Sequence, residues 1–351
     1  MHVVVKQRAL GDGHPTYVIA EMACSHEGNC DIARHLVDVA ADSGSDAVQF
    51  QIISVDDYIV PQHPDYGLYC RLEFKPEEWR GLFRHAQQRG LAVFAAAYDR
   101  PSADLASACG VDAYKLHSAD LSNPYLTQYI AAKGRPVTLG TGGSTIGEIA
   151  DGIQMLREAG APGIILMHGF QNFPTRWEEI HLRYMASLKR LFNVPVGYQD
   201  HTDGESELGF VLPMVAVGLG ANVLEKHFTH DRSQKGVDHE SALNPDELKR
   251  FVQRVKEVDA AMGQASPHPL SSEEQKYRTY AKKSVVAARD IRAGETISAE
   301  MLVFKRSKPP GLAPILGGRF VGQVARRDIA VHTNVTEDML ERHEDLVPDH
   351  R

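Results

Sequence analysis

The sequence has few cysteines and no long hydrophobic run, and these absences exclude several classes of protein. The cysteines are irregularly spaced, at Cys24, Cys30, Cys70 and Cys109. This spacing matches neither a zinc-binding pattern nor a dense disulfide framework, so we expect reduced thiols. No apolar stretch approaches the length needed to span a bilayer. The segment 1–6 lacks the charged and then apolar build of a secretion signal, which predicts a cytoplasmic protein.

Clustered charge is also missing from the chain. The formal net charge is -8 at pH 7, and the charged residues are spread along the 351 positions. The sequence therefore gives no electrostatic reason to expect nucleic acid or an anionic membrane as a partner. What is present is a composition of 43% hydrophobic and 24% charged residues, enough for one large domain and one small domain.

Short β-rich runs alternate with helical patterns from about residue 16 to residue 262, as in parallel α/β folds. The strand candidates are 17–21, 47–51, 92–96, 113–116, 137–140, 163–167, 195–198 and 222–225. Helical patterns between them include 31–43, 75–89, 145–159 and 177–191. Eight β/α units in about 250 residues predict a closed (β/α)8 TIM barrel rather than an open doubly wound sheet. Functional side chains of such barrels lie at the C-terminal strand ends, where we find Glu21, Gln51, Lys115, His168, His201, Glu225 and His227.

Two neighbouring strand ends carry paired polar residues. Side chains alternate along a strand, so Glu225 and His227 share one face while Lys226 points the other way. Gln199 and His201 repeat this arrangement. Two imidazoles beside a carboxylate are a plausible site for a divalent metal ion that polarises a carbonyl or hydroxyl oxygen. The alternative is a pair of half-buried histidines satisfied by hydrogen bonds, and the residues alone leave both interpretations open.

The character of the sequence changes after residue 262. Residues 263–280 are polar and begin with a stretch rich in glycine, proline and serine, which is typical of a linker. Residues 281–345 contain short β-like runs and a Pro-Gly stretch, which predict a compact β-rich module. We therefore expect a barrel domain at 1–262, a linker at 263–280 and a small domain at 281–345.

Several strings in the chain resemble the sialic acid synthases and their relatives, which join a catalytic TIM barrel to a C-terminal antifreeze-like (SAF) domain. The similar motifs follow one another along nearly the whole chain, at residues 19–28, 46–51, 114–123, 197–202, 225–229, 236–239 and 289–295. Members of this family condense phosphoenolpyruvate with the open-chain aldehyde of an N-acylated amino sugar and release phosphate. The resemblance implies a nonulosonic acid synthase that uses a divalent metal ion, Mn2+ or Mg2+.

The resemblance also implies roles for individual residues. His201 and His227 match metal ligands. Glu21, Glu225 and Asp238 match catalytic positions that handle protons, water or sugar hydroxyls. Lys115 and Ser118 match positions that hold the phosphate of the donor. Other substrate-binding positions are matched by Gln49, Gln51, Asp120, His168, Gln171, Phe173 and Gln199.

The donor half of this matched site departs from the family pattern. Gln49 stands where lysine is usual, Gln199 and Gly140 replace serines, Ala96 replaces threonine, and Gln171 stands where asparagine is usual. A charge-assisted hydrogen bond contributes about 1.5–3 kcal/mol, so losing two would weaken phosphoenolpyruvate binding about a hundredfold or more. Two alternatives follow from this. The metal site could serve an aldol-type, lyase-type or condensation reaction with a non-phosphorylated donor, or the protein could be a non-catalytic sugar-binding protein.

In this family the small domain covers the active site of a partner subunit, where an arginine near a Pro-Gly turn holds the acyl group of the substrate. Arg306 and Lys308 both lie near such a turn, and we favour Arg306 for its planar fork of donors. The resemblance thus implies a domain-swapped homodimer that acts on a small sugar-like substrate.

Four residues of the matched motifs have less specific interpretations. Cys24 permits a nucleophile, but a buried unreactive thiol is favoured because activation needs a nearby base or cation. His26, His117 and His239 are candidate ligands or catalysts, and we expect two of the three only to line the pocket.

Overall fold

The computed structural model describes residues 2–170 and 172–341. The chain divides into two compact units, with the boundary between Gly263 and Gln264. Positions 342–345, which we assigned to the small domain, lie outside the described residues. Along the described chain, no helix is long and apolar enough to cross a membrane.

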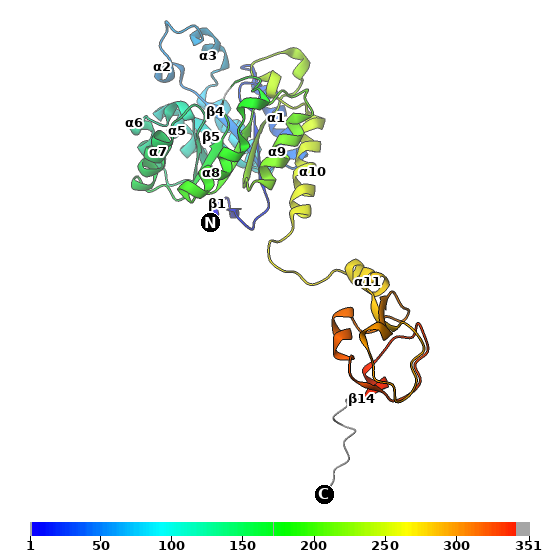
Figure 1. Ribbon diagram of the computed structural model, residues 1–351. Coiled ribbons are helices and arrows are strands. Elements are labelled where there is room, and N and C mark those ends of the chain that lie inside the picture. Colours follow the sequence, from blue (N-terminus) through cyan, green and yellow to red (C-terminus); the bar gives the residue numbers. More distant parts are fainter. Residues whose placement is uncertain (1, 171, 342–351) are drawn as a thin grey trace. The chain divides into compact units, whose positions relative to one another are not determined.

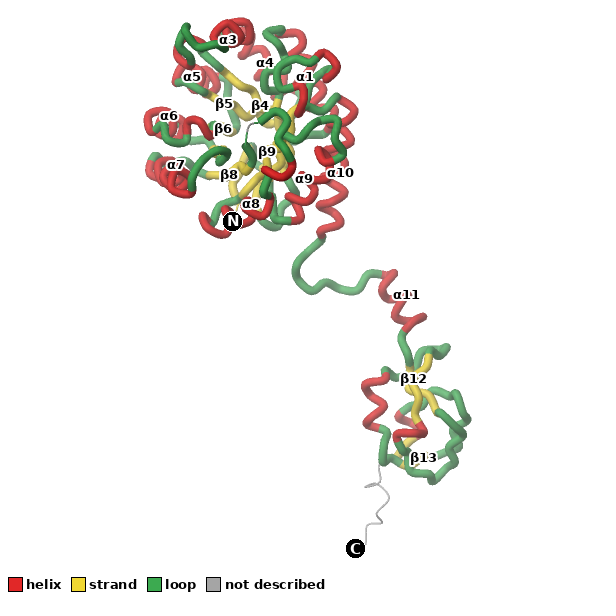
Figure 2. Tube along the Cα trace, turned by 45° about the horizontal axis from the view of Figure 1, so that its top comes forward, coloured by secondary structure: helices red, strands yellow, loops and turns green. Residues whose placement is uncertain are grey.

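Eight parallel strands close into a barrel in the first unit, as Figures 1 and 2 show. The order around the barrel is β10-β3-β4-β5-β6-β7-β8-β9. The strands are β3 Tyr17–Glu21, β4 Ala47–Ile52, β5 Ala92–Ala97, β6 Ala113–Leu116, β7 Val137–Gly140, β8 Ile164–His168, β9 Val196–Asp200 and β10 Val223–His227. Nearly every residue of these strands is buried, as expected of strands covered on both faces. The predicted TIM barrel is confirmed.

Helices surround the barrel and pack their apolar faces on the strands (Figure 2). They are α1 Cys30–Ser43, α4 Pro76–Gln88, α5 Arg100–Ala108, α6 Pro124–Ala131, α7 Ile146–Glu158, α8 Leu182–Phe192, α9 Leu208–Gly218 and α10 Pro245–Met262. Shorter helical segments are α2 Val55–Tyr58, α3 Tyr66–Leu72, η1 Ser118–Asp120, η2 Trp177–Glu179, η3 Arg232–Gln234 and η4 His239–Ser241. Helix boundaries follow capping residues: Asn29 caps α1, and Thr145 and Glu148 form a capping box at the start of α7.

An N-terminal hairpin closes one end of the barrel, and sequence analysis did not predict it. Strands β1 His2–Val5 and β2 Arg8–Gly11 pair antiparallel. Val3, Val5 and Leu10 are buried in one cluster with inward-facing residues of the barrel strands. A Cβ atom on Gly163, just before β8, would lie 2.5 Å from Cγ1 of Val3. Only glycine therefore leaves room for the hairpin to pack against the start of this strand.

A buried ion pair joins β9 to β10 on the face away from the barrel centre. Lys226 Nζ lies 2.6 Å from Asp200 Oδ2, and both side chains are buried. Asp200 also accepts hydrogen bonds from the Tyr198 hydroxyl and from Thr202. Burial raises the pKa of Asp200, but Lys226 and the hydrogen bonds from Thr202 outweigh it, and the pKa is lowered overall. The predicted orientation of Lys226, opposite to that of Glu225 and His227, agrees with this pairing.

Removing one partner of this pair should destabilise the barrel strongly. We expect Lys226→Met to cost about 3–5 kcal/mol of unfolding free energy, because it leaves the Asp200 carboxylate buried without its cation. Urea denaturation of the variant and the wild type measures this difference. The double variant Asp200→Asn/Lys226→Met should recover much of the loss, and Lys249→Met on the exposed side of α10 is the matched control. Equal stability of Lys226→Met and wild type would contradict the prediction.

The second unit contains a small β-rich domain preceded by a helix. Helix α11 Ser272–Ala281 begins within the predicted linker and ends one residue beyond it. It buries no residue and begins with a capping box of Ser271 and Glu274. The domain contains β11 Ser284–Ala287 paired with β12 Leu302–Lys305, and β13 Val324–Ala325 paired with β14 Leu340–Glu341. Three 3-10 segments connect them, η5 Ala299–Met301, η6 Pro314–Arg319 and η7 Glu337–Met339. Its own core includes Val285, Ile291, Ile297 and Phe320.

Candidate active site

Two carboxylates and one lysine form a buried cluster inside the barrel. Glu21 ends β3, Lys115 lies in β6 and Glu225 lies in β10. Lys115 Nζ donates to Glu225 Oε1 at 2.6 Å and to Glu21 Oε2 at 3.2 Å. All three side chains are buried. The sequence analysis expected these three residues at the C-terminal strand ends, and the barrel brings them together there.

Burial and the charges in this cluster shift the pKa values of Lys115 and Glu225. Burial lowers the pKa of Lys115, but the charges of Glu225 and Glu21 outweigh it, so the pKa is raised overall. Burial raises the pKa of Glu225, and the charge of Glu21 adds to this effect against the opposing ammonium of Lys115. The raised pKa favours the protonated form of Glu225 more than in a free carboxyl group, and this direction suits a general acid.

Gln49, in β4, joins the two carboxylates from a third side. Its Nε2 donates to Glu225 Oε2 at 3.1 Å and also to Glu21 Oε2. The Gln49 Oε1 atom is buried and has no hydrogen-bond partner among the described residues. The Gln49 amide therefore bridges the two carboxylates, as a second cation could, but it adds no charge.

His201 and His227 lie side by side at the ends of β9 and β10. Their ring centroids are 4.8 Å apart, and Phe173 packs edge-on against His201 at 5.0 Å. Burial lowers the pKa of both histidines well below the ordinary value, and the nearby Lys115 lowers them further. Both rings are therefore neutral at pH 7, and their nitrogen lone pairs are available for bonding.

The nitrogen atoms of this pair fit a divalent metal ion. Both ring nitrogens of His201 and Nδ1 of His227 are buried without a hydrogen-bond partner among the described residues. Neutral imidazoles with unpaired nitrogens are ligands that divalent transition metals accept. No cluster of three or more His, Cys, Asp or Glu side chains capable of holding a metal occurs in residues 2–170 and 172–341. The two histidines would thus share such an ion with oxygen atoms of water or substrate.

Asp238 adds a third acidic group near the cluster. Burial, followed by the charges of Glu21 and Glu240, raises the pKa of Asp238 to about 6. Its backbone adopts a left-handed conformation with φ 65°, which aspartate and asparagine tolerate better than most residues. The role of Asp238 in holding sugar hydroxyls stays a prediction.

The raised pKa of Asp238 predicts that the native protein loses stability as pH rises from about 4 to 6. Over this range the folded state keeps a proton that the unfolded chain releases, and above it a buried charge remains. Asp238→Asn should therefore gain melting temperature relative to wild type at pH 7.5 but not at pH 4.5. Asp151→Asn, an exposed carboxylate on α7, is the control. A difference in melting temperature that does not change with pH would contradict the assignment.

Gln199 in β9 and His168 in β8, which match substrate-binding positions of the family, contact backbone carbonyls. Gln199 Nε2 donates to the Gly169 carbonyl at 2.8 Å, and the Gln199 side chain is buried. His168 Nε2 lies 2.6 Å from the Ile180 carbonyl, so one ring nitrogen is already engaged. Gln171 lies outside the described residues. Substrate binding by these residues and by Phe173 stays a prediction.

The sugar-side candidates Gln51 and Asp120 lie at the ends of β4 and β6, which are separated by β5. Gln51, in β4, approaches Cys24, whose Sγ is 3.8 Å from Gln51 Oε1. Asp120 accepts a hydrogen bond from Asn123 Nδ2 at 3.0 Å, and burial raises its pKa. Ser118 begins the η1 segment that contains Asp120. These positions are half-buried, so they remain accessible from solvent.

The part of the site that is matched to phosphoenolpyruvate has few side chains that can form hydrogen bonds. Ala96, in β5, pairs in register with Gln51 on one side and Lys115 on the other, where a threonine hydroxyl is usual in the family. A Cβ atom on Gly140 would lie 3.1 Å from the Ser118 backbone nitrogen. The chain therefore leaves little room at position 140 for the serine that this position usually carries.

Three residues of the matched motifs are engaged in local structure. Burial lowers the pKa of His26 to about 4, and His26 stacks on Phe74 while its Nδ1 accepts from the Gly28 amide. His239 accepts from the Gly236 amide and contacts the Thr229 hydroxyl at 3.0 Å. Burial raises the pKa of the Cys24 thiol, and the charges of Asp238 and Glu21 add to this. A protonated thiol agrees with the unreactive interpretation.

Arg306 belongs to the second unit and follows β12. Its guanidinium carbon lies 5.8 Å from the centre of the Tyr280 ring, a cation–π distance. This contact is internal to that unit, so the predicted role of Arg306 or Lys308 at a partner's active site stays a prediction.

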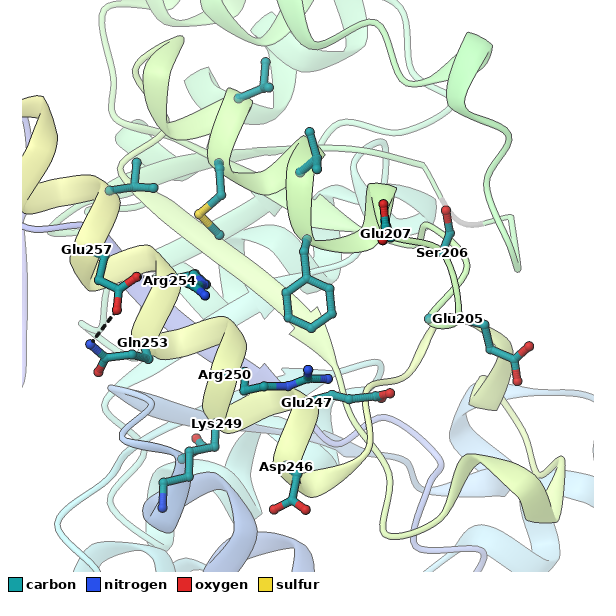
Figure 3. Close-up of a pocket in the computed structure, with 17 residues that line it drawn as sticks. Glu205, Ser206, Glu207, Asp246, Glu247, Lys249, Arg250, Gln253, Arg254 and Glu257 are labelled. Atoms are coloured by element: carbon teal, nitrogen blue, oxygen red, sulfur yellow. Dashed lines mark hydrogen bonds and ion pairs between the residues drawn. The ribbon is translucent and has the colours of Figure 1, made fainter.

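A cavity of about 1270 Å³ lies outside the barrel, between α9 and α10 (Figure 3). It is lined by apolar side chains of α9, including Phe210 and Met214, and by charged side chains of α10, including Arg250 and Glu257. None of the candidate residues lines it. We therefore look for the active site at the strand ends, where the buried titratable groups converge, and not in this cavity.

Sequence analysis missed three tyrosines that border the site. Tyr58 and Tyr69 lie in α2 and α3, and Tyr98 follows β5 directly. For Tyr58 and Tyr69 the available signal was the long segment between the second predicted strand and the next predicted helix, because long connections in compact domains are frequently functional.

Comparisons with known proteins agree with this geometry. Residues 36–267 match the NeuB family, and residues 282–341 match the SAF domain. A N,N'-diacetyllegionaminic acid synthase of Campylobacter jejuni is 33% identical over 89% of this chain and 96% of that protein. An uncharacterised protein of Methanocaldococcus jannaschii is 37% identical over 87% of this chain and 88% of that protein.

A solved structure shows the same similarity. The N-acetylneuraminic acid (sialic acid) synthetase of Leptospira borgpetersenii superposes with a TM-score of 0.73 at 28% identity, covering 80% of this chain and 97% of that one. The family match extends over more than half of the chain and includes the strand ends that carry His201, Glu225 and His227. This chain is therefore a member of the NeuB family of sialic acid synthases and their relatives, with a SAF domain at its C-terminal end.

Proposed function

We propose that this protein condenses phosphoenolpyruvate with the open-chain aldehyde of an N-acylated amino sugar, giving a nonulosonic acid and phosphate. The observation that carries the proposal is the position of two neutral histidines with unpaired nitrogens beside the buried cluster of Glu21, Lys115 and Glu225. In a TIM barrel this end of the strands is the usual place of catalysis. The relatives named above make acids of the same class.

The residues have distinct tasks in this reaction. His201 and His227 would hold Mn2+ or Mg2+, which when bound supplies a Lewis acid for the aldehyde oxygen. The new carbon–carbon bond joins the donor methylene to the aldehyde carbon, and water then adds to the second donor carbon before phosphate leaves. Glu225, whose pKa is raised, can supply a proton, and Glu21 can orient or deprotonate the water. Asp238 would hold sugar hydroxyls.

Calorimetric titration of the Mn2+-loaded protein tests the donor. Phosphoenolpyruvate should bind in the micromolar range, whereas pyruvate, which lacks the phosphate, should not bind detectably. Absence of phosphoenolpyruvate binding at millimolar concentration would overturn the proposed donor and leave the family membership intact.

A second candidate function is a related metal-dependent condensation, aldol or lyase reaction with a non-phosphorylated donor. One observation favours it: Lys115, the cation of the cluster, is already bound to both carboxylates, and Gln49 adds no charge. Phosphoenolpyruvate is close to trianionic, so it would meet a site whose buried charge is net negative. In the titration above, this candidate predicts binding of pyruvate or another 2-oxo acid in place of phosphoenolpyruvate.

Metal content distinguishes the third function considered from the sequence, a non-catalytic sugar-binding protein, from the two enzymatic candidates. Both enzymatic candidates require a stoichiometric divalent ion after gentle purification, since the unpaired nitrogens of His201 and His227 are the groups that would hold it. A protein that binds sugar yet retains no Mn2+ or Mg2+ after reconstitution would support the non-catalytic function.

We also propose a domain-swapped homodimer in which Arg306 of one chain reaches the active site of the other. Mixing inactive Arg306→Ala and His227→Ala proteins tests this arrangement, because a mixed dimer carries one complete active site. Recovery of activity on mixing supports the exchange. Continued inactivity, with mixed dimers detected by mass spectrometry, would contradict it.

A further inference from the structure

The pairing of β9 with β10 stops just before the two candidate metal ligands. The last residues that pair across these parallel strands are Asp200 and Lys226. His201 follows the last residue of β9, and His227 is the last residue of β10. Each histidine therefore comes one residue after a member of the last pair. The pairing of the two strands does not by itself fix the distance between the two imidazoles.

The usual means of orienting a histidine ligand is missing at three of the four ring nitrogens, in the part of the chain that the structure describes. In most metal sites, the ring nitrogen that does not bind the metal donates to a carboxylate or a carbonyl, and this bond fixes the ring. Both nitrogens of His201 and Nδ1 of His227 have no such partner among the described residues. The orientation of the two rings therefore depends on the backbone that carries them.

The ion pair of Asp200 and Lys226 joins the two strands at this level. Lys226 Nζ donates to Asp200 Oδ2 at 2.6 Å. The other carboxylate oxygen accepts from the Tyr198 hydroxyl and from the Thr202 amide, both at 2.9 Å, and also from the Thr202 hydroxyl. Because the bonds from Thr202 to Asp200 span one residue, they close a turn around His201. A buried carboxylate thus fixes the backbone on both sides of this histidine and links it to β10.

The carbonyl groups of the two histidines are held as well. The His201 carbonyl accepts from the Thr175 amide at 2.8 Å and from the Ser241 hydroxyl at 2.7 Å. The His227 carbonyl accepts from the Leu243 amide at 2.9 Å. Each of these bonds ties one histidine to a neighbouring loop, whereas the ion pair ties the two strands to each other.

We propose that Asp200 and Lys226 are positioning residues for the metal site. By holding the ends of β9 and β10 together, their ion pair sets the distance and the angle between the rings of His201 and His227, and so the affinity and coordination geometry for Mn2+. Replacing a buried ion pair by apolar side chains is often neutral for stability, so a directional role accounts for this pair better than stability alone. The inference rests on the proposed function, because it concerns the ion that the two histidines would hold there.

Metal binding by a double variant tests this role. Asp200→Asn/Lys226→Met removes the ion pair without leaving a buried charge, and the asparagine can still accept from the Thr202 amide. Mn2+ is titrated calorimetrically into the full-length protein, below the melting transition of each variant. We expect the double variant to bind Mn2+ about tenfold to a hundredfold more weakly than wild type. The visible absorption spectrum of bound Co2+, which reports coordination geometry, should also differ from that of wild type.

Two further variants separate positioning from a general loss of stability. Arg8→Met/Asp46→Asn removes an ion pair between β2 and the start of β4, and this matched control should bind Mn2+ as wild type does. Thr202→Val keeps the ion pair and removes one hydrogen bond to Asp200. It should weaken Mn2+ binding about twofold to tenfold, the effect of one neutral hydrogen bond. This variant decides the question if the double variant does not fold.

The outcomes separate this inference from the proposed function. Unchanged Mn2+ affinity and an unchanged Co2+ spectrum in the folded double variant, or in Thr202→Val if the double variant does not fold, would overturn the positioning role and leave the metal-dependent condensation standing. An equal loss of affinity in the Arg8→Met/Asp46→Asn control would also overturn it, because any weakening of the barrel would then be sufficient. A wild-type protein that binds no divalent ion would overturn the metal site itself, and the positioning role with it.

Discussion

Gln49→Lys should strengthen the binding of phosphoenolpyruvate about tenfold or more. Gln49 already contacts Glu21 and Glu225, so an ammonium at this position would neutralise the second carboxylate and leave Lys115 free to turn toward phosphate. A charge-assisted hydrogen bond contributes about 1.5–3 kcal/mol, and 1.4 kcal/mol corresponds to a factor of ten. Titration calorimetry with the Mn2+-loaded variant and wild type measures the change.

Gln49→Met is the matched control, since it keeps the length of the side chain and removes its hydrogen-bond donor. It should bind phosphoenolpyruvate no better than wild type, because the two carboxylates then lose their bridge. If Gln49→Lys gained no affinity while remaining folded, phosphate would not be bound beside this cluster. The non-phosphorylated donor would then become the stronger candidate.

His227→Ala should abolish turnover and the retention of a divalent metal ion. A bound metal contributes several kcal/mol of transition-state stabilisation, so we expect a loss of about a thousandfold or more. Elemental analysis after dialysis measures the metal, and phosphate release measures turnover. His201→Ala should have the same effect, and the double variant should lose little more, because the two imidazoles act as a unit.

His268→Ala changes an exposed histidine outside the barrel and is the control for this experiment. It should retain both metal and activity. If His227→Ala kept stoichiometric metal and unchanged turnover, the two imidazoles would not be metal ligands. This result would support the alternative considered from the sequence, in which the two histidines are only satisfied by hydrogen bonds.

The periodicity of the sequence was sufficient to predict the barrel and the face of β10 on which each side chain lies. Alternation along β10 correctly separated Lys226, which pairs with Asp200, from Glu225 and His227, which face the barrel centre. The β1–β2 hairpin escaped prediction because its short apolar run carries no turn glycine, and the connection instead uses positive φ angles at Lys6 and Gln7. Positive φ at such residues has no clear sequence signal.

The contacts within the site could not be predicted from the sequence in the same way. Gln49 could be identified as the loss of a cation, but its bridge between two carboxylates depends on side-chain conformations and on strands far apart in the chain. The contacts of Tyr58 with Tyr69 and Tyr98 are a similar case, since these residues come from α2, α3 and the end of β5. Residues at 58, 69 and 98 share no periodicity, and only the fold brings them together.

The hairpin of β1 and β2 has a consequence for the order in which substrates arrive. Val3, Val5 and Leu10 fill the end of the barrel opposite the strand ends that carry Glu21 and Glu225. Lys115, matched to the donor, is buried, whereas Gln51 and Asp120, matched to the sugar, are half-buried. If the proposed condensation takes place at these residues, the donor lies deeper than the acceptor. Steady-state kinetics should then be ordered, with the donor binding first and the acceptor second.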